Sequence, residues 1–385
     1  MLEYAIKGDK RYYAWVTLLL GLIGVGFGVY LWQLRFGLGI TGLSRDVSWG
    51  FYIAQLTYMV GVAAGGVMVV LPYYLHDYKA FGRITVLGEF LAIAALVVCL
   101  LSVIVDLGQP GRILNVWIHL SPHSVLFWDT VVLNGYLFLN LVVGWNVLQA
   151  ERNGTHYPQW VKPFIYLSIP WAISIHTVTA FLYCGLPGRH FWLTAILAPR
   201  FLASAFAAGP ALLVLLCLII RRVTNFDPGR EQIQTLAKIV TYALIANLFF
   251  FGCELFVAFY SNIPGHMDHI TYLFAGLHGH GVLVPWMWTS MGLMVLALLL
   301  LIPPVTRRNE GVLAVACAML FIGAWIDKGL GLISAGFVPN PLHEVNEYMP
   351  TLPEVIITIG VYAIGALVLT VLYKMAVGVK EEVAA

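Results

Sequence analysis

Charged residues are scarce in this sequence. Only 10% of the 385 residues are Asp, Glu, Lys or Arg, whereas 60% are hydrophobic. Soluble globular proteins carry about 25% charged residues, so the composition excludes that class and indicates a polytopic membrane protein. The basic residues form no long tract and the net charge is only +2, which leaves no support for nucleic-acid binding.

Cysteine is also rare, and its placement limits the redox groups that the chain can hold. The five cysteines stand singly in separate apolar stretches, with no C-x-x-C-H motif and no cluster: Cys99, Cys184, Cys217, Cys253 and Cys317. We therefore expect no iron–sulfur cluster, no covalent haem and no metal site in the chain itself. The cysteines are interpreted as small hydrophobic residues in helix packing.

Long apolar stretches take up most of the chain instead. Ten of them reach about the 20 residues that a helix needs to cross a hydrocarbon core. Unpaired backbone groups are intolerable in lipid and the alternating pattern of a membrane barrel is missing, so each stretch is predicted to be a helix. The first is too long for a signal peptide and is expected to remain a span. The predicted spans are 13–36, 50–75, 84–105, 125–149, 161–185, 200–220, 239–260, 280–302, 311–335 and 353–374.

Lys and Arg are distributed unevenly between the two sides of the predicted helices. One side holds both termini and fifteen of these residues: Lys7, Lys10, Arg11, Lys79, Arg83, Arg152, Lys162, Arg221, Arg222, Arg230, Lys238, Arg307, Arg308, Lys374 and Lys380. The other six are Arg35, Arg45, Arg112, Arg189, Arg200 and, inside a span, Lys328. Because basic loops stay in the cytoplasm, we predict a cell-membrane protein with both termini cytoplasmic.

The longer connections all fall on the predicted outer side. They comprise residues 37–49, 106–124, 186–199, 261–279 and 336–352. Such an elaborate surface suggests that an extracytoplasmic partner docks there, although extended loops can also simply cover the helix ends.

Several ionisable residues are predicted inside or at the ends of spans, where a charge needs a partner or a water-filled path. Glu89 and Asp106 lie on the third span, about 25 Å apart at 1.5 Å per residue. They could mark two ends of a proton route, or Asp106 could cap its helix or pair with Arg112. Asp129 enters the fourth span one turn after His123.

Four further ionisable residues lie near the outer ends of the later spans: Glu254, His278, Asp327 and Lys328. Adjacent residues on a helix point in different directions, so Asp327 and Lys328 are each expected to pair with another span. The set could form a structural network or a second proton route. His176, deep in the fifth span, could be a buried and satisfied histidine, a proton carrier or a haem ligand.

Aromatic residues open the second span. Trp49, Phe51, Tyr52 and Tyr58 could anchor the helix at the membrane interface or line a pocket for a flat ring. Tyr58 is deeper, with Gln55 nearby, where a phenol and an amide could hydrogen-bond a lipid-soluble ligand.

At this point the sequence resembles the NrfD/PsrC family, the membrane subunits of polysulfide reductase and related quinone-linked complexes. The motifs that carry the resemblance are W-G-x-Y with the following G-V-A-A-G-G (49–66), D-L-G-Q-P-G-R (106–112) and S-P-H-S-V-L-F-W-D (121–129). W-I-D-K-G-L-G-L-I (325–333) and G-F-V-P-N-P-L-H-E (336–344) look most like the DsrP branch, from the DsrMKJOP complexes of dissimilatory sulfur metabolism.

The resemblance implies an all-α fold of two four-helix bundles plus two additional helices, divided as 1–150, 151–302 and 303–385. It also implies a menaquinone pocket at the outer face of the first bundle and no redox centre in this subunit. Electrons would pass to or from a ferredoxin-like iron–sulfur subunit, beside other membrane and cytochrome subunits of a DsrMKJOP-like complex.

The residue-by-residue match carries roles at the quinone pocket. Catalytic roles fall on Asp106, Asp129 and Arg112, and quinone-binding roles on Gln33, Trp49 and Tyr58. His119 and His123 are further quinone-binding candidates because they lie in the same loop, without an aligned ligand in the family. Oxidising a quinol releases two protons and two electrons, so carboxylates and imidazoles could accept the protons. Glu89 and His176 could connect the pocket to the cytoplasm and allow proton translocation.

Two other functions compete with this interpretation. A haem b cytochrome would use His176 and an outer histidine as axial ligands, but it needs two imidazoles at matching depth and only one lies deep. A secondary transporter would be expected to have inverted repeats and broken helices around a midplane site. No clear repeat is visible.

Overall fold

The computed structural model describes residues 1–76 and 78–384, and it is helical, with no strand in that part of the chain. Each of the ten predicted spans is confirmed as a helix or a run of helices. The spans are α2 (Lys10–Phe36), α3 (Phe51–Gly65) with α4 (Val67–Leu75), α5 (Thr85–Asp106), α7 (Val125–Arg152), α8 (Lys162–Cys184), α9 (Leu197–Val223), α10 (Arg230–Tyr260), α12 (Val284–Leu301), α14 (Glu310–Trp325) with the π-helical segment η5 (Ile326–Gly331) and α15 (Leu332–Ala335), and α16 (Leu352–Ala384).

Shorter elements connect these spans. They are α1 (Leu2–Ile6), η1 (Gly37–Ile40), η2 (Lys79–Arg83), η3 (Pro110–Arg112), α6 (Asn115–Ile118), η4 (Gln159–Val161), α11 (Pro264–Phe274) and α13 (Pro304–Arg308).

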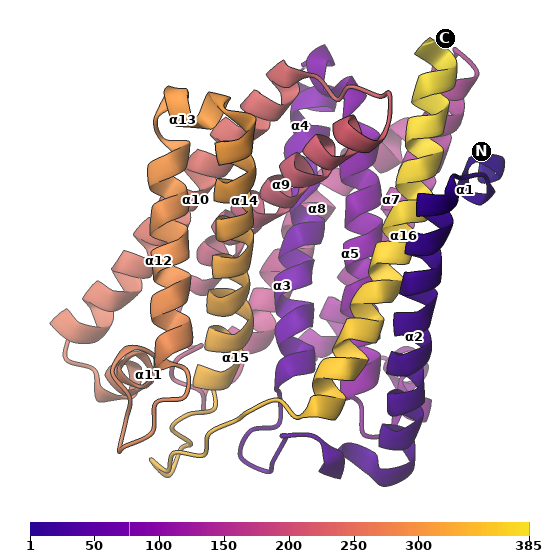
Figure 1. Ribbon diagram of the computed structural model, residues 1–385. Coiled ribbons are helices and arrows are strands. Elements are labelled where there is room, and N and C mark those ends of the chain that lie inside the picture. The colour runs from indigo at the N-terminus through magenta and orange to yellow at the C-terminus, as the bar shows by residue number, and fades with distance from the viewer. Residues whose placement is uncertain (77, 385) are drawn as a thin grey trace.

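The spans pack as two groups of four and one outer pair, which confirms the predicted fold class. Helices α3, α5, α7 and α8 form one bundle, α9, α10, α12 and α14 form the other, and α3 and α9 join them. Helices α2 and α16 lie along one another, and α16 also packs on α5 and α7 (Figure 1). These contacts cross residues 150 and 302, and the division of the chain at those two positions stays a prediction.

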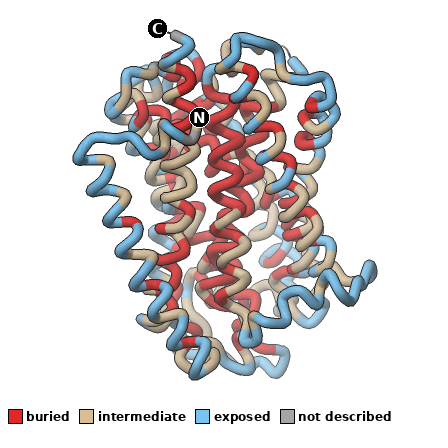
Figure 2. The backbone as a smooth tube through the Cα atoms, turned by 90° about the vertical axis from the view of Figure 1, so that its right-hand side faces the viewer, coloured by how far each residue is buried: buried red, intermediate tan, exposed pale blue. Residues whose placement is uncertain are grey.

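Glycines set the closest helix contacts. A Cβ atom on Gly65 of α3 would lie 2.6 Å from the Cα of Gly209 on α9, and one on Gly26 of α2 would lie 2.7 Å from the Cα of Gly360 on α16. Any side chain at these positions would force the helices apart. The small-residue run of the second span therefore packs helix against helix, and α3 is buried along nearly its whole length at the centre of the molecule (Figure 2).

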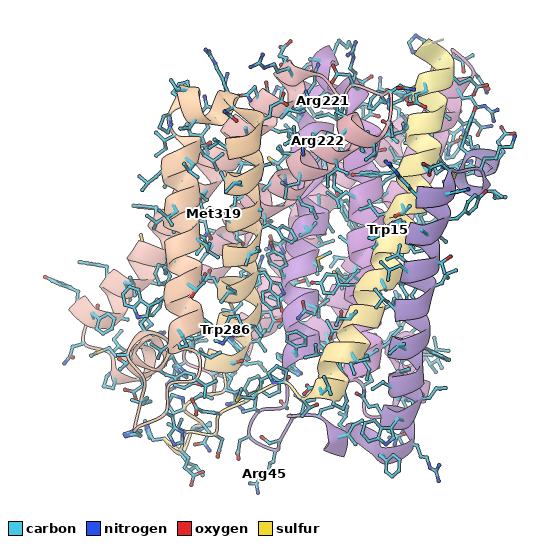
Figure 3. The ribbon with its side chains drawn as sticks, viewed as in Figure 1. Trp15, Arg45, Arg221, Arg222, Trp286 and Met319 are labelled. Atoms are coloured by element: carbon cyan, nitrogen blue, oxygen red, sulfur yellow. The ribbon has the colours of Figure 1, made fainter. Side chains whose placement is uncertain are left out.

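The two termini lie at one end of the bundle and the five long connections at the other (Figure 1). We call these the terminal end and the loop end. Arg221 and Arg222 lie toward the terminal end and Arg45 at the loop end (Figure 3). The connections that the charge pattern assigns to the two sides of the membrane therefore lie at opposite ends of the bundle.

Candidate functional site

Polar side chains from three helices meet at the loop end. Gln33 is one of the few buried residues of α2, and its Nε2 donates to the carbonyl of Val105 on α5 at 2.6 Å. Tyr52 of α3 donates its hydroxyl to Gln33 Oε1 at 2.7 Å. Next to Val105, the Oδ1 atom of Asp106 is buried and has no hydrogen-bond partner among the described residues. This group, Gln33, Tyr52 and Asp106, is called the Asp106 site below.

Asp129 belongs to the same bundle. It is buried on α7, and the hydroxyl of Thr179 on α8 donates to its Oδ1 at 2.6 Å. The neighbouring Tyr183 of α8 shares a hydrogen bond with Thr57 of α3. Asp129 is thus held against α8 by a neutral donor, and no ion pair of this carboxylate is present among the described residues.

Trp49 stands in a cluster of rings where α3 begins. It stacks on the fully buried Trp192, with ring centroids 5.9 Å apart, and meets the rings of Tyr183 and Phe337 edge-on. Such contacts fix the entry to α3 rigidly.

Three of the predicted site residues are exposed. Arg112, His119 and His123 lie on the connection after Asp106, and within the described residues no ion pair joins Arg112 to Asp106. Their predicted part in a quinone pocket stays a prediction, since this structure does not bring them to the Asp106 site.

Tyr58 faces the second bundle rather than the Asp106 site. Its hydroxyl donates to the carbonyl of Phe321 on α14 at 2.6 Å, and its ring meets the Phe321 ring at 5.1 Å. On the same helix, Gln55 accepts hydrogen bonds from Trp325 and Tyr362, each at 2.8 Å. The amide that the sequence pointed to is therefore engaged with α14 and α16.

Glu89 and His176 are both buried, in different surroundings. Both carboxylate oxygens of Glu89 lack a hydrogen-bond partner among the described residues. His176 contacts the amine of Lys328 through Nε2 and lies against the ring of Phe201, while its Nδ1 has no partner in the described part.

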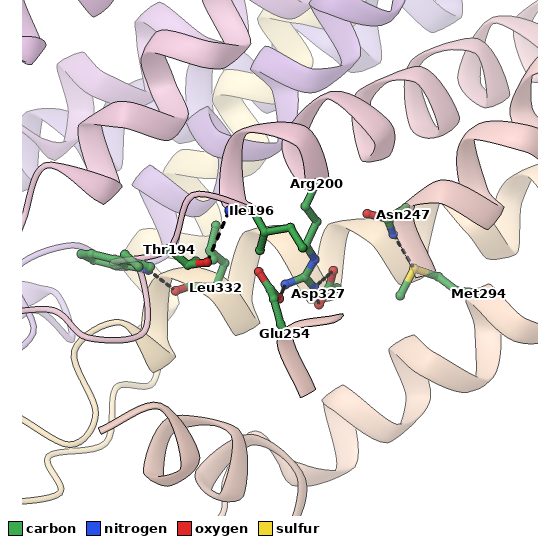
Figure 4. Close-up of polar contacts among 9 residues, drawn as sticks. Thr194, Ile196, Arg200, Asn247, Glu254, Met294, Asp327 and Leu332 are labelled. Atoms are coloured by element: carbon green, nitrogen blue, oxygen red, sulfur yellow. Dashed lines mark hydrogen bonds and ion pairs between the residues drawn. The ribbon is translucent and has the colours of Figure 1, made fainter. Parts of the chain in front are cut away.

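An arginine and two carboxylates form a buried network inside the second bundle. The Nη2 atom of Arg200 on α9 lies 2.8 Å from both oxygens of Asp327, and Nη1 contacts Glu254 on α10 (Figure 4). Asp327 and Lys328 thus pair with different spans, as the sequence predicted. The π-helical turn that carries them directs one into each bundle. His278, also predicted for this group, lies exposed in a tight turn, because the eighth span begins only at Val284.

The segments at the loop end are fixed by buried hydrogen bonds. The carboxylate of Glu354 accepts from the backbone of Gly42 at 2.8 Å and from the hydroxyl of Tyr348 at 2.6 Å. Tyr348 also accepts from the backbone N–H of Phe51 at 2.7 Å. Burial and the adjacent Glu354 carboxylate raise the pKa of Tyr348 above its usual value, so the phenol stays protonated.

A buried histidine holds the connection after α15 in place. The Nδ1 atom of His269 on α11 lies 2.6 Å from the carbonyl oxygen of Ala335 and 2.7 Å from that of Val338. Burial lowers the pKa of His269 to about 4, so the ring is neutral at physiological pH and donates from Nδ1.

Clusters suited to metal binding are not found in the described part of the chain. Across residues 1–76 and 78–384, no three His, Cys, Asp or Glu side chains gather closely enough to hold an ion. The polar groups of the Asp106 site can instead accept or donate hydrogen bonds to an organic ligand.

These features define an integral membrane protein, with ten apolar helices among the described residues and polar groups gathered at one end. The family model described as polysulphide reductase, NrfD, matches residues 39–338, and the chain belongs to this family.

Curated relatives align along most of their length. The chain is 26% identical to a protein of Halobacterium salinarum provisionally assigned as a membrane subunit of dimethyl sulfoxide reductase, over 92% of this chain and 88% of the relative. It is 23% identical to one of the selenate reductase subunits of Mesobacillus selenatarsenatis, over 95% and 94%. It is 21% identical to the integral membrane subunit of menaquinone reductase of Nitratidesulfovibrio vulgaris, over 95% and 91%.

The sequence did not indicate that Tyr52 bonds to Gln33 or that Arg200 bonds to Asp327. The sequence indicates Tyr52 only as an anchor or pocket wall, and Arg200 only as a basic residue on the outer side. An arginine in an apolar helix together with lone acids in two other spans was the available signal for the Arg200 network.

Proposed function

We propose that this chain is the quinone-interacting membrane subunit of a respiratory oxidoreductase complex. It exchanges electrons between menaquinol or menaquinone and a ferredoxin-like iron–sulfur subunit docked at the loop end. Family membership supports this proposal, as do relatives named as subunits of reductases, one of them the integral membrane subunit of a menaquinone reductase.

The observation that carries the proposal is the carboxylate oxygen of Asp106 that has no hydrogen-bond partner within residues 1–76 and 78–384. A buried carboxylate oxygen without a donor is costly, and the hydroxyl of a quinol would supply the missing hydrogen bond. Gln33 and Tyr52 are joined beside it and give the site a polar wall. When a quinol is oxidised there, Asp106 accepts a hydroxyl proton while the two electrons leave to the partner subunit.

The remaining predicted residues are proposed to act around this centre. Asp129 is a second proton acceptor, which takes up a proton after the hydrogen bond from Thr179 breaks. Trp49 is a rigid wall at the entry to α3. Tyr58 supports the site indirectly through its bond to α14. Arg112, His119 and His123 act from the surface where the partner docks.

Equilibrium binding tests this function directly. The full chain in lipid nanodiscs is expected to bind a short-chain menaquinol analogue saturably, and Asp106→Asn is expected to bind it more weakly, because a neutral amide replaces the charged acceptor of the quinol hydroxyl. The readout is titration calorimetry, with Asp9→Asn as the control because asparagine preserves the cap that Asp9 gives α2. Absence of saturable binding to the native chain would overturn the proposal.

The orientation in the membrane is part of the proposal. We place both termini in the cytoplasm of a cell membrane, on the basis of the fifteen basic residues on the terminal side. The partner subunit then meets the loop end from outside. A fluorescent protein fused to the C-terminus should fold and fluoresce, and a dark fusion with normal expression would reverse the orientation.

A role in dissimilatory sulfur metabolism is the finer proposal. It rests on the likeness of residues 325–333 and 336–344 to the DsrP branch, whose complexes also contain cytochrome subunits. Neighbouring genes for a secreted multi-cluster ferredoxin and a cytochrome subunit would support it, and genes for another terminal reductase would count against it.

Proton movement is proposed to involve Glu89 and His176. Glu89 lies on the same helix as Asp106, toward the terminal end, and His176 is linked to Lys328 at the junction of the bundles. Glu89→Gln is expected to abolish proton movement coupled to quinol oxidation in vesicles while quinone binding is retained, because glutamine cannot carry a proton. Unchanged acidification in this variant would remove Glu89 from the route.

A further inference from the structure

A groove lies between α3, α14 and α16 in the half of the molecule near the loop end. It has a volume of about 290 Å³, which is close to the lower end of the range of small-molecule sites. Its lining comprises Phe51, Gln55, Phe321, Ile322, Trp325, Val355, Thr358, Ile359 and Tyr362. The α16 wall lies beyond residues 39–338, the part of the chain that the family model matches.

The groove faces the lipid. Ile322 on α14 and Ile359 on α16 line it and are 50% and 45% exposed, although both lie within membrane spans. An occupant must therefore come from the bilayer.

One polar group in the groove has no hydrogen-bond partner in the part of the chain that the structure describes. Thr358 is 5% exposed, and its hydroxyl is buried without a hydrogen-bond partner among the described residues. Several other threonines within the helices donate to the carbonyl four residues earlier, as Thr57 does to Ile53 at 2.8 Å and Thr370 to Ala366 at 2.6 Å. The Thr358 hydroxyl is a donor left available to a ligand.

A second donor stands nearby in a fixed position. Gln55 accepts from Trp325 and Tyr362 through Oε1, and its Nε2 donates to the carbonyl of Phe51 at 3.0 Å. These three bonds hold the amide still, and one Nε2 hydrogen remains free for an acceptor.

We propose that this groove binds the ring of a membrane quinone, with a ring carbonyl accepting from Thr358 and Gln55. The aromatic walls of Phe51, Phe321 and Trp325 suit a flat ring, whose edge and face they can pack against. A phospholipid acyl chain has no acceptor and would leave the Thr358 hydroxyl unpaired. The inference rests on the proposed function and adds a second quinone site.

The groove is close to the Asp106 site along α3. Phe51 lines the groove, and the next residue, Tyr52, bonds to Gln33. The first turn of α3 thus separates the two sites, and a quinone in the groove waits beside the Asp106 site with access to the lipid.

Photoaffinity labelling tests the second site. The full chain in nanodiscs is labelled with an azido-naphthoquinone bearing a short isoprenoid tail, and labelled peptides are mapped by mass spectrometry. Label competed by excess naphthoquinone is expected on residues 321–325 or 355–362. Thr358→Val should raise the half-saturating concentration for these peptides by about 2- to 10-fold, the effect of one neutral hydrogen bond.

Two further variants make the result specific. Val355→Phe should fill the groove and lower groove labelling at least tenfold, while label near Asp106 persists. Thr289→Val is the matched control, because Thr289 lies on α12 with its hydroxyl bonded to Pro285, and it should label like the native chain.

The outcomes separate the two proposals. Competable label only on α2 or α5 peptides, or groove label that phospholipid displaces and quinone does not, would overturn the groove alone. Groove label unaffected by both Thr358→Val and Val355→Phe would do the same. No competable label anywhere would overturn the proposed function as well.

Discussion

Replacing Arg200 with methionine is expected to lower the free energy of unfolding by about 3–5 kcal/mol, the cost of leaving buried carboxylates without their cation. Arg200 is 8% exposed and bonds to both oxygens of Asp327 and to Glu254, so two acids lose their partner at once. Thermal unfolding of the purified chain in detergent, followed by the loss of soluble monomer, measures the change.

Two comparisons make the Arg200 result decisive. Arg221 pairs with Glu310, but both side chains are about 30% exposed, so Arg221→Met should cost only about 0–1 kcal/mol. Combining Arg200→Met with Glu254→Gln and Asp327→Asn removes the stranded charges and should recover part of the loss. Equal effects of Arg200→Met and Arg221→Met would show that the network does not stabilise the second bundle.

Asp106→Asn is expected to slow menaquinol oxidation by the assembled complex by about 10²- to 10⁴-fold, the range for a lost proton acceptor. Asparagine keeps the shape and can still hydrogen-bond a quinol, but it cannot take up the hydroxyl proton. Stopped-flow reduction of the partner's iron–sulfur groups by a menaquinol analogue measures the rate.

The control for Asp106 must leave assembly and binding intact. Asp9→Asn at the terminal end serves this purpose and should react at the native rate. Rates within a factor of two for Asp106→Asn and the native complex, with equal partner content, would exclude Asp106 as the proton acceptor.

The ten spans could be predicted because burial in lipid needs only length and apolarity. Their limits were harder to predict. Helix α10 begins at Arg230 rather than 239, and α16 continues to Ala384 rather than 374. Helical hydrogen bonds continue into polar segments beyond the hydrocarbon core, where hydropathy gives no signal. Beyond the spans and their approximate limits, the sequence indicated which polar residues lie within the spans but not which residues they contact.

Helix geometry alone predicted that Asp327 and Lys328 pair with different residues. It did not predict which residues those are. Arg200 is 127 residues from Asp327, and His176 is 152 residues from Lys328. Likewise, Tyr58 lay at the expected depth but turned to Phe321 on α14. Such pairings depend on which helices become neighbours, and hydropathy does not encode that arrangement.

The pairing of α2 with α16 has a consequence for biogenesis. The first span makes its extensive contacts with the last one, through the Gly26–Gly360 approach and a hydrogen bond from Trp15 to Thr370. More than three hundred further residues are synthesised after α2 before α16 begins. The newborn first helix must therefore wait in the translocon or the surrounding lipid until synthesis is nearly finished, and a protein truncated before Leu352 would leave it without its principal neighbour.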